Sequence, residues 1–179
     1  MEKIRILQKD RLIDFFYKKM TFSILILTIG IPGAGKTKWV TEYKKTHPLT
    51  HVISTDDIRL ELTGVEQCVD PSQNDMIHGE ARKRVKHILN DTTQHHGLGP
   101  EIIIDSTNCT VDEWMAYKRL GASIIRAIVF DCEPDQAMIH QQQRERKVPL
   151  EIVQMKWDQL QENIHHLPKI FNMIDHIKP

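Results

Sequence analysis

Short apolar stretches alternate along the chain with amphipathic stretches that have helical spacing. The apolar stretches have the composition of buried strands and occupy residues 24–29, 51–54, 102–105 and 124–130, with 170–174 as a weaker fifth candidate. Strands that are apolar on both faces are typical of a parallel sheet covered by helices on each side. Because helical segments separate the strands, the pattern predicts right-handed crossovers and a doubly wound α/β sandwich.

Local signals mark the starts of several helices. Thr110 and Glu113 have the spacing of a capping box, and Pro134 and Pro149 each suit a first helical turn. The last long helix should be followed by Pro168. Five of its residues recur at steps of three and four and predict core packing: Leu150, Val153, Trp157, Leu160 and Ile164.

Length and composition favour one domain. The chain has 179 residues, 40% of them hydrophobic, and we expect an N-terminal extension over residues 1–20 and a single domain over 21–179. Acidic and basic residues balance at 24 each, so no overall field attracts nucleic acid or anionic lipid. The longest apolar run, residues 22–29, is far shorter than the roughly 18 residues that a membrane helix needs.

The cysteines argue against a secreted protein, and the histidines argue against a structural zinc site. Three thiols without C-x-x-C spacing, at Cys68, Cys109 and Cys132, fit a reducing compartment, so we expect a cytoplasmic protein. The histidine pairs at residues 95–96 and 165–166 have no further ligand at metal spacing, so no structural zinc is expected.

The segment GIPGAGKT satisfies the phosphate-binding pattern G-x-x-x-x-G-K-[ST], which arises by chance in a chain of this length about 1% of the time. It follows an apolar strand and precedes a potential helix, residues 38–45. This order allows backbone N–H groups to converge on a polyphosphate at the N-terminus of the helix. We expect ATP and Mg²⁺ here, with Lys36 on the β- and γ-phosphates and Thr37 on the metal; a glycine-rich turn without a ligand is the alternative. The expected nucleotide-binding residues are Gly30, Pro32, Gly33, Ala34, Gly35, Lys36 and Thr37.

The rest of the sequence favours transfer of a phosphate over its release to water. No N-K-x-D motif, no D-x-x-G switch after the third strand and no pair of acids at a strand end is present in the sequence. These absences disfavour GTPases and motors. The short chain leaves room for a nucleotide core and an acceptor pocket, which favours a small kinase.

The segment STDDIR follows the second predicted strand. If a helix begins there, Asp56 and Arg59 lie one turn apart on one face, at the edge of the sheet where ligands bind. A carboxylate can accept the proton of an attacking hydroxyl, and a guanidinium can neutralise phosphate oxygens. In the alternative, the Asp caps the helix and the Arg simply pairs with it.

Two later segments supply further candidates. After the third strand, Asp105 is placed to hold Mg²⁺, and Thr107 and Asn108 to contact nucleotide or acceptor, unless DSTN is only a polar turn. Arg144 and Arg146 precede a predicted helix and can close over ATP, although a solvated basic turn is an equal alternative on these residues alone.

The order GIPGAGKT, STDDIR, DSTN and an arginine-bearing segment before V-P resembles the kinase domain of T4-type and clostridial-type polynucleotide 5′-kinases, over about residues 24–160. The resemblance implies a three-layer P-loop NTPase sandwich with four to five parallel strands and a helical lid. It implies that Asp56 is the general base, that Arg59 contacts the acceptor phosphate, and that Arg144 or Arg146 grips the ATP phosphates. The lid is shorter than in the phage enzymes, and Asp105 fits the clostridial pattern better than the phage one.

The acceptor itself is less well indicated. A single-stranded nucleic acid end should meet a basic path, yet the cluster Arg82, Lys83, Arg84 and Lys86 spreads around its predicted helix and favours a solvated face. Small P-loop kinases of sugars, antibiotics or metabolites use similar machinery, so a small-molecule kinase is the first alternative. A non-catalytic ATP-binding module that controls a partner is the second.

Overall fold

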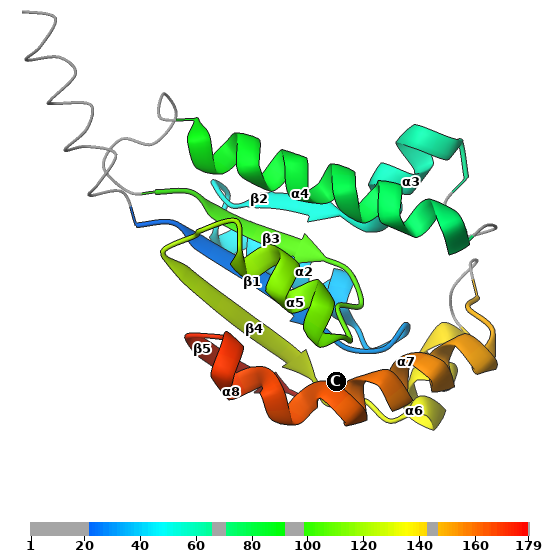
Figure 1. Ribbon diagram of the computed structural model, residues 1–179. Coiled ribbons are helices and arrows are strands. Elements are labelled where there is room, and N and C mark those ends of the chain that lie inside the picture. The colour runs from blue at the N-terminus through cyan, green and yellow to red at the C-terminus, as the bar shows by residue number, and fades with distance from the viewer. Residues whose placement is uncertain (1–21, 66–70, 92–98, 143–146, 179) are drawn as a thin grey trace, which may run out of the picture.

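Five parallel strands form the centre of the protein in a computed structural model that describes residues 22–65, 71–91, 99–142 and 147–178. The strands lie in the order β2-β3-β1-β4-β5 (Figure 1). Their bounds are Ile24–Ile29 for β1, His51–Ser54 for β2, Glu101–Asp105 for β3, Ile124–Phe130 for β4 and Met173–Ile177 for β5. The predicted parallel sheet is confirmed, while the proposed extension over residues 1–20 lies outside the described residues.

The fifth strand lies three residues later than predicted. The apolar residues that suggested a strand over 170–174 begin in a short helix, α8 (Leu167–Ile170), whose first turn contains Pro168. Ile170 and Phe171 then pack into the core, each 6% exposed, before the chain extends into β5. The sequence pattern was therefore apolar for two different reasons, and the strand itself carries the polar residues Asp175 and His176 among its apolar ones.

The helices lie between the strands, and two of them begin where local signals predicted, near Thr110 and Pro134. They are α2 (Lys36–Thr46), α3 (Thr55–Thr63), α4 (Asn74–Asn90), α5 (Val111–Lys118), α6 (Pro134–Gln141) and α7 (Leu150–Asn163), with 3-10 turns at Pro71–Gln73 and Ile164–His166. The capping box is confirmed at α5, where the Glu113 backbone N–H donates to the Thr110 hydroxyl over 3.3 Å and the Thr110 N–H donates to the Glu113 carboxylate over 2.9 Å. Pro134 lies in the first turn of α6, whereas Pro149 is the N-cap of α7 and stands one residue before it.

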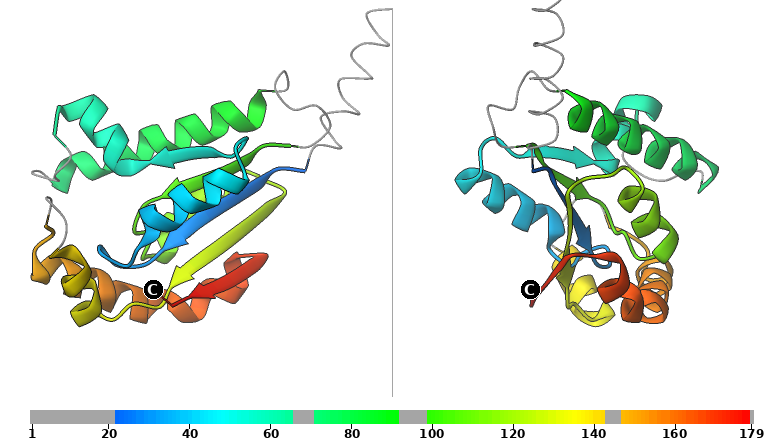
Figure 2. Two further views of the ribbon diagram at one scale, coloured as in Figure 1. Left: turned by 180° about the vertical axis from the view of Figure 1, so that it is seen from behind. Right: turned by 60° about the vertical axis from the view of Figure 1, so that its left-hand side comes forward.

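Helices cover both faces of the sheet, as Figures 1 and 2 show from opposite sides. Helices α4, α5 and α8 pack on one face, and α2 and α6 pack on the other. Helix α7 contributes to both layers, since Val153 packs with α2 and α6 and Leu160 with α5 and α8. Leu150 was wrongly included in the core stripe: it is 50% exposed because it stands at the first turn, before the helix reaches the sheet.

Candidate active site

The phosphate-binding loop has the backbone that only glycine adopts readily. Gly33 and Gly35 have φ angles of 90° and 88°. Gly35 is the N-cap of α2 and supplies no side-chain cap, so the N–H groups of the first turn remain available to an anion. At Gly33 an added Cβ would lie 2.6 Å from the Ala137 carbonyl oxygen, which shows how closely α6 packs against the loop.

Gly33→Ala should destabilise the protein much more than Gly35→Ala. Both impose a left-handed backbone on a side chain, at a cost of about 1–2 kcal/mol, but only Gly33→Ala adds a clash, worth about 1–3 kcal/mol more. No heavy atom lies within 4 Å of a Cβ added at Gly35, which makes that variant the matched control. Urea unfolding of both variants measures the difference; equal losses of unfolding free energy would contradict the packing of α6 on the loop.

Lys36 lies at the centre of the loop and is only 8% exposed. Its ammonium donates to the carbonyl oxygens of Gly30 over 2.9 Å and of Ile31 over 2.7 Å. The loop is also tied to the segment after β3, because the Gly30 N–H donates to the Thr107 carbonyl over 3.0 Å. The ammonium is therefore held where phosphates bound by the loop would meet it.

A cavity of about 440 Å³ adjoins the loop between α2 and β2. Its polar lining comes from Thr37, Thr41, Lys44, Lys45, Ser54, Asp57 and Asp105. Burial raises the pKa of Asp105, whereas the charge of Lys36 and a hydrogen bond from the Thr37 hydroxyl lower it, and the carboxylates of Asp56 and Asp57 raise it again. The cavity thus holds a partly neutralised group of carboxylates beside the phosphate loop.

These residues fit Mg²⁺, the ion that the resemblance implies. Its preferred ligands are oxygens, and in kinase sites it is usually held through one or two protein groups together with substrate phosphates. Thr37 and Asp105, the predicted metal residues, present a hydroxyl and a carboxylate to the same cavity. Among the described residues, no three His, Cys, Asp or Glu side chains form a metal cage by themselves, so substrate phosphates would have to complete the coordination.

Asp105→Asn should stabilise the protein at neutral pH. Because burial raises the folded-state pKa above the ordinary 3.8, the protonated carboxyl favours folding, and this contribution is lost as pH rises from 3.8 through the folded-state pKa. The amide carries no charge at either pH. Urea unfolding should therefore show variant and wild type to be alike near pH 4 and the variant to be more stable at pH 7.5. If the difference in unfolding free energy between variant and wild type did not widen as the pH rises, burial of this carboxylate would not have the expected cost.

Asp56 and Arg59 form the pair that the sequence predicted. Arg59 Nη1 lies 2.7 Å from Asp56 Oδ1, with the Arg59 side chain 8% exposed and the Asp56 side chain 56% exposed. The hydroxyl of Ser54 caps α3 by accepting from the Asp57 N–H over 3.1 Å, so Asp56 is not the N-cap. Arg59 also donates to Asn74 Oδ1 over 3.3 Å. The guanidinium is thus fixed between α3 and α4, while the Asp56 side chain is more than half exposed.

Thr107 and Asn108, the two predicted substrate-binding residues after Asp105, have different surroundings. Asn108 is fully buried, has a φ of 44° and donates through its amide to the Thr28 carbonyl over 2.8 Å. Its own carbonyl accepts from the Trp114 indole over 2.6 Å. These bonds hold Asn108 between β1 and α5, and its contact with substrate stays a prediction. Thr107 holds the phosphate loop through its carbonyl, and a substrate contact by its side chain stays a prediction.

The predicted lid arginines, Arg144 and Arg146, lie outside the described residues. The residues on either side of them are joined, because the Val148 N–H donates to the buried side chain of Gln141 over 2.7 Å. His140 Nδ1 lies 3.1 Å from the carbonyl oxygen of Gly33 in the phosphate loop. The flanking residues are therefore held beside the nucleotide site, and the contact of either arginine with ATP stays a prediction.

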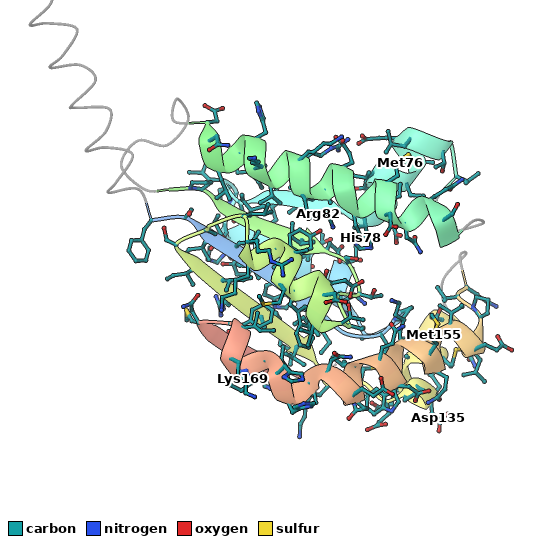
Figure 3. All side chains as sticks on the ribbon, in the orientation of Figure 1. Met76, His78, Arg82, Asp135, Met155 and Lys169 are labelled. Atoms are coloured by element: carbon teal, nitrogen blue, oxygen red, sulfur yellow. The ribbon has the colours of Figure 1, made fainter. Side chains whose placement is uncertain are left out.

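The predicted basic cluster on α4 does not form one patch. Arg84 pairs with Glu61 and Glu80, and Lys83 lies 3.8 Å from Glu80 with its side chain 80% exposed. Arg82 lies on another side of the helix, facing α5 (Figure 3). The interpretation as a solvated face therefore suits Lys83 and Arg84.

Asp57 is a candidate site residue that the sequence analysis missed, although its place directly after Asp56 in STDDIR was the available signal.

A family model described as an AAA domain matches residues 25–167, from β1 to the first residue of α8. The chain belongs to this AAA domain family. The matched residues include the phosphate loop and the first four strands, so the AAA domain assignment agrees with a nucleotide-binding site at this loop. Within the described residues, no helix combines the length and apolar character that crossing a membrane requires.

Solved structures place this AAA domain among P-loop kinase folds. One chain of the Pnkp1/Rnl/Hen1 RNA repair complex matches with a TM-score of 0.68 and 20% identity, over 81% of this chain and 46% of that one. A second Pnkp1/Rnl/Hen1 structure matches with a TM-score of 0.55 and 22% identity, over 72% and 41%. A gluconokinase from Sinorhizobium meliloti 1021 matches with a TM-score of 0.58 and 10% identity, over 88% and 83%.

These matches confirm the P-loop kinase-type fold and the resemblance to polynucleotide kinases. At such identities the likeness to solved structures concerns the fold alone. The AAA domain spans less than half the length of the RNA repair chains that it matches.

Proposed function

We propose that the protein is an ATP-dependent kinase that transfers the γ-phosphate to a hydroxyl, and that its acceptor is the 5′-hydroxyl of a polynucleotide. The arrangement of Asp56 carries this proposal. Its exposed carboxylate is held by the buried guanidinium of Arg59, next to the phosphate loop and the buried carboxylate of Asp105. A nucleotide-binding module without catalysis would not need an exposed carboxylate fixed at this point.

Each of these residues has its own role in the proposed phosphoryl transfer. Asp56 accepts the proton of the attacking hydroxyl, and Arg59 neutralises an oxygen of the acceptor phosphate. Lys36 and the N–H groups of the first turn of α2 bind the β- and γ-phosphates. Thr37 and Asp105 would hold Mg²⁺, which would supply positive charge beside the phosphates. Arg144 and Arg146 close over ATP and help exclude water.

A polynucleotide acceptor is supported by the motif order and by the RNA repair chains among the matching folds. A small hydroxyl-bearing metabolite is the second candidate, and the match to a gluconokinase over 83% of that chain favours it. A reducing, cytoplasmic location follows from the thiols and remains part of the proposal.

One assay separates these acceptors. Purified protein is incubated with Mg²⁺ and γ-labelled ATP, together with a single-stranded 5′-hydroxyl RNA, the matching DNA, or gluconate. We expect label on the oligonucleotides and none on gluconate. The matched control is a 5′-phosphorylated oligonucleotide of the same sequence, which should accept nothing. Label on gluconate alone would replace the proposal with a small-molecule kinase; ATP binding without any transfer would favour the nucleotide-binding module.

A further inference from the structure

A hydrogen bond between two hydroxyls, those of Thr55 and Ser106, joins the start of α3 to the end of β3. Thr55 is the first residue of α3 and is only 5% exposed. Its hydroxyl donates to the Ser106 hydroxyl over 3.1 Å. Asp56, the general base of the proposed mechanism, is the next residue along the chain. The bond therefore ties the sheet to the residue directly before the base, and the proposed mechanism gives neither hydroxyl a role.

Helix α3 leaves the sheet without a connecting loop, which brings the two hydroxyls together (Figure 1). Ser54 is the last residue of β2 and is paired with Asp105, the last residue of β3. The next residue is Thr55 on one segment and Ser106 on the other. Because the two strands are parallel, both segments leave the sheet at the same edge, where ligands bind in open α/β sheets.

Ser106 is itself held by β1, the strand that leads into the phosphate loop. The Thr28 hydroxyl shares its proton between the carbonyl oxygens of Ser106, at 3.0 Å, and Ile104, at 3.1 Å. The same hydroxyl accepts from the Ser106 N–H over 3.3 Å, and Thr28 is fully buried. One residue later, the Thr107 carbonyl accepts from the Gly30 N–H in the phosphate loop. Ser106 therefore stands at a fixed point between the phosphate loop and α3.

Two other hydrogen bonds near the start of α3 hold it in different directions. The bond from the Asp57 N–H to the Ser54 hydroxyl closes a local turn. The bond from Arg59 to Asn74 joins α3 to α4, and the two helices could shift together without breaking it. The bond between the Thr55 and Ser106 hydroxyls instead links α3 to β3, and through β3 to the phosphate loop.

We propose that Thr55 and Ser106 are positioning residues that hold Asp56 at the distance from the phosphate loop that phosphate transfer requires. This inference rests on the proposed function, in which Asp56 is the general base. Phosphoryl transfer depends mainly on positioning and charge, and a displacement of about 1 Å can cost about a hundredfold in rate. The pair acts through Asp56 and touches neither substrate, so its loss should lower kcat and leave ATP binding unchanged.

The test starts from Thr55→Val, which keeps the shape of the side chain and removes its hydroxyl. With a saturating 5′-hydroxyl oligonucleotide, kcat should fall about 10- to 100-fold, while the KM and the calorimetric affinity for ATP stay at wild-type values. Thr55→Ser returns the hydroxyl and should restore most of the lost rate. Ser106→Ala should lower kcat as Thr55→Val does, and the double variant should be no slower than the slower single variant, because both substitutions remove the same bond.

Thr63→Val is the matched control on the same helix. The Thr63 hydroxyl donates to the Arg59 carbonyl over 2.7 Å and to the Val65 carbonyl over 3.1 Å, near the C-terminal end of α3. Its loss should leave kcat at the wild-type value. A wild-type kcat in Thr55→Val would overturn the inference. So would a Thr55→Val whose ATP affinity and thermal stability fall with kcat, or a Thr55→Ser that is as slow as Thr55→Val.

Hydrogen exchange tests the same link if no acceptor is phosphorylated and the proposed function fails. The Asp57 amide lies in the first turn of α3, where it donates to the Ser54 hydroxyl. Its exchange should be about fivefold faster or more in Thr55→Val than in wild type, because the turn has lost its bond to β3. Thr55→Ser should exchange as wild type does. Faster exchange without transfer would support the link and place the failure in the proposed function; unchanged exchange would overturn the link itself.

Discussion

Asp56→Asn should abolish phosphate transfer while leaving ATP binding unchanged. The asparagine keeps the size of the side chain but cannot accept the proton of the attacking hydroxyl, and loss of a general base costs about 10²–10⁴ in rate. ATP binding should survive because Asp56 lies on α3, outside the phosphate loop. The measurements are the rate of labelled transfer to a 5′-hydroxyl oligonucleotide and the calorimetric affinity for ATP.

The ion pair with Arg59 requires a control for folding. Asp56 neutralises a guanidinium whose side chain is only 8% exposed, so the variant removes a counter-charge from a buried cation that also donates to Asn74. Circular dichroism and thermal unfolding will show whether the variant is folded. Asp57→Asn is the matched variant: its carboxylate lines the cavity beside Thr37, so it should alter the Mg²⁺ dependence of transfer more than the rate at saturating Mg²⁺. A folded Asp56→Asn that transfers phosphate at the wild-type rate would remove Asp56 from the role of base.

The sheet was predictable wherever burial on both faces left a continuous apolar stretch. Residues 24–29 are such a case, since Leu25, Ile26, Leu27 and Ile29 are all fully buried in β1. The same rule failed at the edge of the sheet, where residues 170–171 are apolar because they cover the core from a helix and its end. A one-dimensional pattern records burial, but it does not record which element provides it.

Within the site, contacts that are local in sequence were predictable and those that depend on folding were not. The pair Asp56–Arg59 follows from helical spacing once a helix begins at Thr55. The sequence marked Asn108 as a substrate contact, but it did not show that its amide donates to the carbonyl of Thr28 in β1, eighty positions earlier. The bond from Arg59 to Asn74 depends on the packing of α3 against α4, which no local pattern encodes.

Lys36→Ala should lose both ATP binding and transfer, which distinguishes it from Asp56→Asn. The ammonium supplies charge-assisted hydrogen bonds to the β- and γ-phosphates, and the bonds that strengthen as charge moves in the transition state cannot be replaced by water. We expect transfer to fall by about 10²–10³ or more and ATP affinity to fall by at least about tenfold. Calorimetry and the labelled-transfer assay measure the two effects separately.

The structure adds a second consequence of this substitution. Because the Lys36 ammonium donates to the carbonyls of Gly30 and Ile31, its removal also deletes two hydrogen bonds that hold the loop. Some loss of affinity will therefore come from a loop that is less well ordered before ATP binds. Lys38→Ala is the matched control, since Lys38 is an exposed lysine on the same helix and should change neither quantity. If Lys36→Ala bound ATP as wild type does, the phosphate loop would have lost its assigned cation, and the nucleotide site would have to be sought elsewhere.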